Sequence, residues 1–451
     1  MSIWSIIVAI IMLGLLVTVH ELGHFWVARL LKIKAYEVAI FVGPKLIDWR
    51  RNDVEYSIRA IPFGAYVRFT DFDENGEAIV SDDPNLLINS PRWKRLLVSL
   101  AGPFMNLVLG VLIFSVLFSL TDYATLEVGG IRPGSQLAEV VINETAPFDI
   151  GDEVLKVNGN RVMTAYDYLY EVDQGISKTE TCVLTMRSHT TGDIYEMELV
   201  PQIEQRPMIG ITHYPEIDER YNGWEIIDVS ESQNNGDPIL EIGDYLVAVD
   251  GKSVADEDFV DYLNNLTEGD TMRLTYVRNG VEYEEDCIKT LMTYANDRGL
   301  MLYSYEVTDF STFLGALKTA CLMPYTVVNV SVKSIGDVFE GQEEVYNMVS
   351  GPIGMTSVVS DVVDDVDDSF MEKFVTVVQM AGIISIGLVL TNMLPIPGLD
   401  GVQVILIVVE MIMGHPMSKK AENVINVAGF VLLICLALFA FASDIIRIIL
   451  E

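Results

Sequence analysis

The first thirty residues, Met1 to Leu30, read MSIWSIIVAIIMLGLLVTVHELGHFWVARL and combine a long apolar run with ionisable side chains. The run is almost unbroken, and His20, Glu21 and His24 stand near its end. A helix from Trp4 to Leu31 is about 42 Å long, enough to cross a bilayer with some tilt. Because ionisable groups at membrane depth are costly, they usually mark function. The stretch therefore predicts a membrane-spanning helix that carries chemistry.

The spacing of these three residues indicates a metal site. His20 and His24 are four residues apart, so both imidazoles leave the same face of a helix and can bind one ion. Glu21 can reach a water on that ion, and the pattern H-E-x-x-H is a zinc signature in which the glutamate is the general base. A histidine buried only for packing would not explain the second histidine and the glutamate on one turn. A catalytic zinc also takes a third protein ligand, which must come from elsewhere in the chain.

Composition places the chain among membrane proteins with a large soluble part. It has 451 residues, 50% hydrophobic residues and a mean hydropathy of +0.34. The formal net charge of −35 argues against nucleic acid as a partner. The four cysteines show no C-x-x-C spacing, so neither a disulfide framework nor a cysteine zinc site is expected. The N-terminus lacks a basic region and a cleavage site, which favours a retained span.

We expect four transmembrane helices, at residues 1–31, 96–120, 374–401 and 423–442. Lysines and arginines are frequent between the first two, which places residues 32–95 in the cytoplasm and the N-terminus outside. The segment 308–340 is apolar but contains two lysines and a proline. We interpret it as an interfacial helix on the outer face, because a further crossing would put the end of the 374–401 span on the wrong side for a shared metal.

Residues 32–95 are expected to form a small β-structure near the membrane. The stretches Glu37–Trp49 and Val54–Phe69 alternate apolar and polar residues and are rich in β-branched and aromatic types. Gly43-Pro44 and Pro62-Phe63-Gly64 interrupt them. Strands at membrane depth must be paired or buried, so we expect a hairpin that dips toward the metal.

The soluble part contains an internal repeat. The segment GDEVLKVNGNRV at Gly151–Val162 is echoed by GDYLVAVDGKSV at Gly243–Val254, a separation of 92 residues, which is the size of a small domain. Each copy predicts a turn, a strand, an Asn-Gly or Asp-Gly turn and a second strand. This pattern resembles the PDZ domain, whose members accept an extended peptide as an added strand. A generic hairpin is the alternative, but two copies favour tandem PDZ domains at 125–205 and 206–292.

The segment Asn392–Gly401, NMLPIPGLDG, ends the span expected at 374–401. Two prolines and two glycines should unwind the helix there and leave the carboxylate of Asp400 near membrane depth. In the four-span topology Asp400 then lies at the same cytoplasmic depth as the H-E-x-x-H motif, which a shared metal requires.

With these motifs the sequence resembles the site-2 protease family of intramembrane zinc metalloproteases. It most resembles the bacterial regulator-of-sigma-E-protease type, which has two PDZ domains and cleaves membrane-bound anti-sigma factors. The likeness covers nearly the whole chain. The matching segments are HELGH at His20–His24, AGPFMN at Ala101–Asn106, SGP at Ser350–Pro352 and NMLPIPGLDG at Asn392–Gly401.

The resemblance implies roles for further residues. Asp400 is the third zinc ligand, and Asn392, with Pro395 and Pro397, contacts the substrate. The segment Ile61–Val67 corresponds to the membrane-dipping β-loop of the family, whose residues pair with substrate; in this chain those residues are Ala65, Tyr66 and Val67. Two departures concern substrate fit: Ala65 replaces the second glycine of the family's Gly-Gly-Tyr, and Val402-Gln403 replaces Gly-His after Leu-Asp-Gly.

The sequence thus predicts a polytopic α-helical membrane protein with four transmembrane helices, a membrane-associated β-hairpin region and two inserted PDZ domains. Zinc held by His20, His24 and Asp400 would polarise a water and the scissile carbonyl, and Glu21 would take the proton of the water. By the resemblance, the substrates are transmembrane proteins, such as anti-sigma factors or remnant signal peptides, first trimmed by a site-1-type protease. The enzyme would lie in the lipid of the bacterial inner membrane, with its PDZ domains outside and acting as a size filter.

Two other classes of protein are compatible with parts of the sequence. A non-catalytic membrane-anchored PDZ scaffold would use the repeat but has no need of Glu21 beside two histidines. A metal transporter would carry polar residues along several spans, whereas here they gather at one depth.

Overall fold

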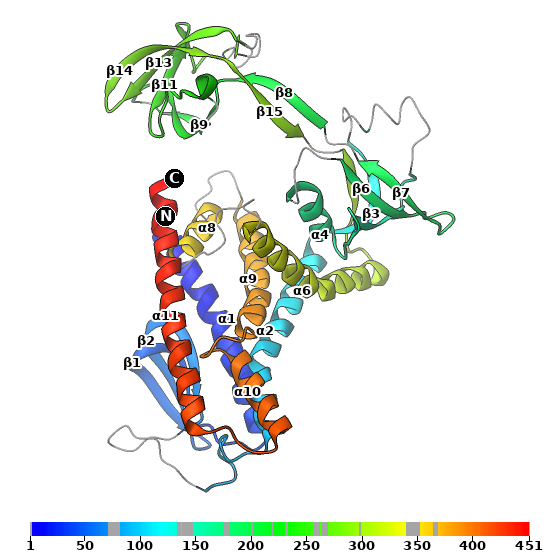
Figure 1. Cartoon of the computed structure of the whole chain (residues 1–451), viewed down its shortest axis with the longest axis vertical. Coiled ribbons are helices and arrows are strands. Elements are labelled where there is room, and N and C mark those ends of the chain that lie inside the picture. Colours follow the sequence, from blue (N-terminus) through cyan, green and yellow to red (C-terminus); the bar gives the residue numbers. More distant parts are fainter. Residues whose placement is uncertain are drawn as a thin grey trace. The chain divides into compact units, whose positions relative to one another are not determined.

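The fold is seen in a computed structural model of the chain (Figure 1). It describes residues 2–70, 82–132, 137, 148–174, 181–199, 202–218, 220–230, 233–256, 259, 262–263, 269–296, 299–339, 352–363 and 369–450. The chain forms two compact units. The first consists of Met1–Leu126, Val162–Tyr168 and Leu302–Ile448, and the second of Glu127–Arg161, Leu169–Met301 and Ile449–Glu451. The first unit is mainly helical, and the second mainly β-structure.

The helices of the first unit are mostly long and apolar. They are α1 (Ile3–Leu30), α2 (Arg92–Leu120), α6 (Phe310–Phe339), α8 (Pro352–Val363), α9 (Phe370–Asn392), α10 (Asp400–Met413) and α11 (Lys419–Leu450). Within the described residues, five stretches are long and apolar enough to cross a membrane: Trp4–Leu30, Arg92–Leu120, Phe310–Gly336, Phe370–Asn392 and Val427–Asp444. The unit therefore has the composition of a polytopic membrane protein.

The segment around Asp400 differs from the sequence-based expectation. We expected the span at 374–401 to unwind at its prolines and glycines and to leave Asp400 in the unwound segment. Helix α9 does end at Asn392, but Asp400 is the first residue of a separate helix, α10. The prolines of the intervening segment lack backbone N–H groups and so end α9. The apolar residues after Asp400 then restart a helix, which was not predicted from the sequence.

Glycines bring α1, α2 and α9 into close contact. A Cβ atom on Gly23 of α1 would lie 2.4 Å from the carbonyl oxygen of Ala101 in α2. A Cβ on Gly110 of α2 would lie 2.6 Å from Ile386 of α9, and Ser385 of α9 donates a hydrogen bond to the carbonyl of Asn106 at 2.8 Å. Small residues let helix backbones approach closely, as is usual in membrane bundles.

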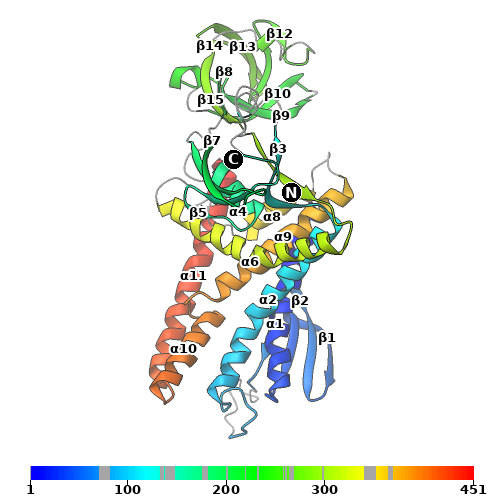
Figure 2. The ribbon, with the colours of Figure 1, turned by 90° about the vertical axis from the view of Figure 1, so that its right-hand side faces the viewer.

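Helix α6 lies across the ends of α2 and α9 rather than along them (Figure 2). Its small residues Ala316 and Ala320 are fully buried in a cluster with Phe114 and Phe118 of α2 and Ile386 of α9. By length and composition, the stretch Phe310–Gly336 of α6 could also cross a membrane.

Strands β1 (Glu37–Arg51) and β2 (Val54–Arg68) build a small sheet beside α1. Both strands bend sharply, so each contributes two segments to the sheet. Glu37 therefore lies opposite Arg68 on one side and Glu55 on the other. The sheet order is therefore residues 65–68, 37–40, 55–58 and 47–50. The bends lie near the expected interruptions, where Gly43 and Gly64 have φ of 89° and 73°. The segment 65–68 forms one edge of this sheet.

Two larger sheets contain the repeat. Strands β3 (Tyr123–Ile131), β4 (Glu153–Val157), β6 (Cys182–Arg187) and β7 (Ile194–Leu199) follow one another in the first sheet, and β10 (Gly223–Val229), β11 (Tyr245–Val249), β13 (Thr271–Arg278) and β14 (Val281–Ile288) in the second. The short strands β5 (Asn160–Arg161) and β12 (Lys252–Ser253) pair with β4 and β11. Beside β5 in sequence lies the short helix α4 (Ala165–Leu169).

The outermost strands show that the second copy is inserted into the first. Strand β9 (Ile211–Asp218) pairs with β10 in the second sheet. The matching place beside β3 is taken by β16 (Leu300–Tyr305), which follows the second copy in sequence and lies beyond the range 125–205 expected for the first domain. Strands β8 (Gln202–Met208) and β15 (Thr290–Asn296) form an antiparallel ribbon that leads into and out of the second copy.

The same hydrogen bonds recur in both copies. In the first, Asn158 accepts a bond from the backbone N–H of Val183 through its side chain, at 2.8 Å. In the second, Asp250 accepts one from the backbone N–H of Arg273, also at 2.8 Å. The repeat seen in the sequence is therefore a repeat of structure.

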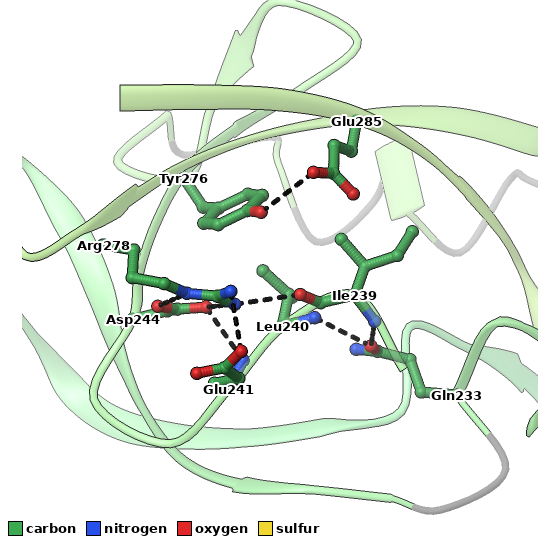
Figure 3. Close-up of polar contacts among 8 residues, drawn as sticks. All are labelled: Gln233, Ile239, Leu240, Glu241, Asp244, Tyr276, Arg278 and Glu285. Atoms are coloured by element: carbon green, nitrogen blue, oxygen red, sulfur yellow. Dashed lines mark hydrogen bonds and ion pairs between the residues drawn. The ribbon is translucent and has the colours of Figure 1, made fainter. Parts of the chain in front are cut away.

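The aspartate of each Gly-Asp pair is buried, but its partners differ between the copies. Asp152 accepts a hydrogen bond from the hydroxyl of Tyr195 at 2.5 Å. Asp244 instead forms a two-pronged ion pair with Arg278, at 2.8 and 2.7 Å (Figure 3). The guanidinium also lies 5.2 Å from the ring centre of Tyr276. The Arg278 pair thus holds β13 on the turn before β11.

We expect Arg278→Ala to destabilise the second copy by up to about 3 kcal/mol, because it leaves the buried Asp244 carboxylate without its partner. The control is Arg273→Ala on the same strand, whose pair with Asp286 is more than half exposed and should contribute about 0–1 kcal/mol. The loss of stability in each variant is measured from the protease resistance of the full-length protein in increasing concentrations of urea. Equal effects of the two variants would contradict a special role of the buried pair.

Candidate metal centre

Three predicted ligands meet in the helical unit. His20 Nε2 lies 2.9 Å from Oδ2 of Asp400, His24 Nε2 lies 3.3 Å from the same oxygen, and the two Nε2 atoms are 3.2 Å apart. Both histidines are buried, and Asp400 is about one-fifth exposed. Among the described residues, this is the one group of three His, Cys, Asp or Glu side chains arranged to hold a metal. The sequence separation of 380 residues is closed by the packing of α10 against α2.

The distances fit a tetrahedral zinc ion. Two atoms bound to zinc at about 2.0–2.1 Å with a tetrahedral angle between them are about 3.3 Å apart. The three observed separations lie between 2.9 and 3.3 Å. Two imidazoles and one carboxylate also match the ligand set of zinc hydrolases, which leave the fourth position open.

The outward nitrogens of both imidazoles are held by α2. Nδ1 of His24 lies 2.7 Å from the carbonyl oxygen of Val98, so it carries the proton and leaves Nε2 free for a metal. The amide of Asn106 lies against Nδ1 of His20, with Nδ2 at 3.4 Å, and Oδ1 of this fully buried side chain has no partner in the described part of the chain. Turning the amide by 180° lets Oδ1 accept the proton of His20 Nδ1, which fixes the same tautomer.

Gly102 explains how α2 comes so close to the ligands. A Cβ on this residue would lie 2.3 Å from Nε2 of His24 and 2.6 Å from Nε2 of His20. Glycine is therefore required by the metal ligands themselves. In the sequence this glycine is recognisable only as part of the segment Ala101–Asn106.

We expect Gly102→Ala to lower zinc affinity and activity by about 10–100-fold, the range seen when groups that support metal ligands are altered. The added methyl group occupies space that both Nε2 atoms need. Zinc titration against a competing chelator measures the effect. Gly387→Ala in α9 is the control, because its Cβ would meet no atom within 4 Å; equal zinc affinity of the two variants would contradict the steric argument.

Glu21 contacts the small β-sheet. Its carboxylate accepts a hydrogen bond from the backbone N–H of Val67 at 3.1 Å. In strands, successive residues direct their backbone groups to opposite sides, and the carbonyl of Arg68 already bonds the N–H of Tyr36. Val67 therefore turns its N–H away from the sheet and toward α1. A hydrogen bond thus connects Glu21, the predicted general base, with Val67 on the predicted substrate-binding edge.

A buried carboxylate stabilises this edge. Glu37 is 4% exposed and bonds Nη2 of Arg59 at 2.6 Å and the hydroxyl of Ser57 at 3.1 Å, and Arg68 lies 3.3 Å away. Burial by itself raises the pKa of Glu37, but the hydrogen bonds from Arg59 and Ser57 outweigh it and lower the pKa below its ordinary value. Glu37 therefore stays charged and ties the edge segment to the rest of the sheet.

The other predicted site residues lie outside this cluster. Asn392 is the last residue of α9, and Pro395 and Pro397 follow in the segment between α9 and α10. Among the described residues these three form no hydrogen bond or ion pair with the metal ligands. Ala65 and Tyr66 lie on the edge segment beside Val67. The Ser350-Gly351 part of the Ser-Gly-Pro motif lies outside the described residues.

Known proteins resemble this chain over its whole length. The profile of peptidase family M50 matches residues 8–436. The chain belongs to peptidase family M50. Its relatives include a putative zinc metalloprotease of Clostridium acetobutylicum, 25% identical over 99% of this chain and 98% of that one. Others are the zinc metalloprotease RasP of Geobacillus kaustophilus, 24% identical over 98% and 97%, and the regulator of sigma E protease of Haemophilus influenzae, 23% identical over 99% and 99%.

Membership of family M50 agrees with the geometry of the three ligands. A metallopeptidase needs a metal that polarises the substrate carbonyl and a base, and this chain has a metal-ligand cluster with Glu21 on the same helix turn. The scaffold and transporter alternatives are therefore set aside for this M50 peptidase.

Proposed function

We propose that this M50 peptidase is an intramembrane zinc metalloprotease that hydrolyses peptide bonds within transmembrane segments of other proteins. The observation that carries the proposal is the cluster of His20, His24 and Asp400 on helices that consist mostly of apolar residues. A polar cluster inside such helices serves function rather than stability. The names of the relatives add zinc as the metal.

Each residue of the site has its own role in the proposed reaction. Zinc bound by the three ligands would supply Lewis-acid chemistry, polarising a carbonyl and making a water more acidic. Glu21 takes the proton of that water as general base. The edge segment Ala65–Val67 holds the substrate in extended form, because a peptide bond within a helix is shielded. Asn392, with Pro395 and Pro397, contacts the substrate backbone from the other side.

The test is cleavage of a single-span membrane protein by the purified enzyme in liposomes. The masses of both products locate the cleaved bond. A bond within the hydrophobic segment is expected, and a cut confined to the flanking soluble parts would overturn the proposal.

We further propose the topology expected from the sequence. Helices α1, α2, α9 and α11 cross the membrane, and α6 lies in its outer surface. The metal centre is near the cytoplasmic side of the bacterial inner membrane, and the repeat is outside. The excess of lysine and arginine in residues 32–95 supports this orientation.

The substrates are membrane proteins such as anti-sigma factors or remnant signal peptides, trimmed first by a site-1-type protease. The support is the name of the Haemophilus influenzae relative, a regulator of sigma E protease. The two β-domains are of PDZ type and act as a size filter that excludes substrates with a bulky outer domain. Exclusion of wrong partners is one of the two routes to specificity.

Deleting the two β-domains, together with the segment Val162–Tyr168 that lies between their strands, should raise cleavage of an untrimmed substrate and leave that of a trimmed one unchanged. A short flexible linker can replace residues 127–301, because Thr125 Oγ1 lies 3.3 Å from the carbonyl oxygen of Tyr303 and the cut ends are adjacent. Cleavage of both substrates is measured in membranes with equal amounts of enzyme. Loss of trimmed-substrate cleavage in a stably folded protein would mean that the domains recruit substrate.

A further inference from the structure

Helix α10 carries a charged side chain near each end, and its other residues are uncharged. Asp400 begins the helix at the metal centre, and Glu410 lies ten residues later, about 15 Å along the axis. Asp400 contacts His20 and His24 of α1, and Glu410 contacts Arg95 of α2. The position of the third metal ligand therefore depends on how α10 is fixed.

The N-terminal end of α10 offers little rigidity of its own. The chain leaves α9 at Asn392 and passes through two prolines and Gly398, which has φ of 102°. Such a segment lacks the continuous hydrogen bonds of a helix and cannot pass the orientation of α9 on to α10. Gly401 packs closely on the end of α9, since a Cβ there would lie 2.4 Å from the carbonyl oxygen of Met393.

The C-terminal end of α10 is fastened by an ion pair. Glu410 is 7% exposed, and its Oε2 accepts a hydrogen bond from Nη1 of Arg95 in α2 at 2.9 Å. Its Oε1 accepts the N–H of Met417 at 3.3 Å. Arg92, also in the first turn of α2, donates to the carbonyl of Gly414 at 2.9 Å. A charged, largely buried hydrogen bond of this kind is directional and fixes the rotation of the helix that carries it.

Arg95, which binds Glu410 of α10, lies on the same face of α2 as the groups that support the metal ligands. Positions 95, 98, 102 and 106 recur every three or four residues and so lie along one side of the helix. Val98 holds His24, Gly102 abuts both imidazoles, and Asn106 holds His20. Arg95 continues this row by one turn and reaches Glu410. One face of α2 therefore aligns the ligands of α1 and, through Arg95, the helix that presents Asp400.

We propose that Arg95 and Glu410 are positioning residues of the metal centre: their ion pair sets the rotation and height of α10 and so places the Asp400 carboxylate on the metal. The inference rests on the proposed role of Asp400 as third ligand. In the described part of the chain, neither side chain forms a hydrogen bond or ion pair with His20, His24 or Asp400.

The experiment compares zinc affinity in full-length protein purified in detergent, by competition with a chelator. Arg95→Glu and Glu410→Arg should each weaken zinc binding by about 10–100-fold, as altered supporting groups do. The double variant Arg95→Glu/Glu410→Arg restores a pair of opposite charges and should recover most of the affinity. Gln403→Ala, at an exposed position of the same helix, is the control and should bind zinc like wild type.

A second comparison separates positioning from stability. Glu410→Gln should weaken zinc binding in the wild-type background and have no further effect in an Asp400→Ala background, because no carboxylate remains to be placed. Thermal unfolding of the zinc-free proteins reports stability alone. Single variants that unfold earlier but bind zinc with wild-type affinity would overturn the proposal, as would a double variant that fails to recover affinity. If Asp400→Ala itself binds zinc normally, the ligand assignment fails instead.

Discussion

Replacing Glu21 with glutamine is expected to leave zinc bound and to lower the rate of peptide cleavage by about 10²–10⁴-fold, the usual contribution of a positioned base. An amide cannot take the proton of the attacking water. Its oxygen can still accept the hydrogen bond that Val67 donates to Glu21, so the side chain keeps its place. Metal analysis of the purified variant and turnover of a single-span substrate measure the two effects separately.

Glu306→Gln is the matched control for this experiment, since it removes a carboxylate at an exposed position. Its zinc content and turnover should equal those of wild type. Near-normal turnover by Glu21→Gln protein with full zinc content would show that another group acts as the base. Loss of zinc together with turnover would instead give Glu21 a structural role.

The ligands on α1 could be predicted from the sequence because their geometry is local. Four residues along a helix bring His20 and His24 to one face whatever the rest of the chain does. The third ligand required the resemblance to a family, since nothing in the spacing of residues relates position 400 to position 20. The break between α9 and α10 was predictable from Pro395 and Pro397, but the new helix after it was not.

The supporting groups could not be found in the sequence. The carbonyl of Val98 is a backbone atom that every residue possesses, and Gly102 is decisive only because two imidazoles lie against it. The pairing of Arg95 with Glu410 depends on how two helices far apart in the chain pack. For the repeat, the Gly-Asp pairs and the Asn-Gly and Asp-Gly turns predicted the two copies. The place of β16 beside β3 reflects long-range strand pairing that no local pattern encodes.

Asp400→Ala is expected to lower zinc affinity by about 100-fold or more, above the 10–100-fold range of residues that only support ligands. The substitution leaves two imidazoles where a stable site needs three protein ligands. The carboxylate that it removes lies 2.9 Å from His20 Nε2, so the zinc loses a ligand directly beside that nitrogen. Cleavage should fall with zinc occupancy, and raising the zinc concentration should restore part of it. Metal analysis and chelator competition provide the measurement, with Gln403→Ala as the control on the same helix. Full zinc content in Asp400→Ala protein would place the third ligand elsewhere, whereas loss of zinc with unchanged unfolding of the zinc-free protein would assign the loss to coordination rather than to folding.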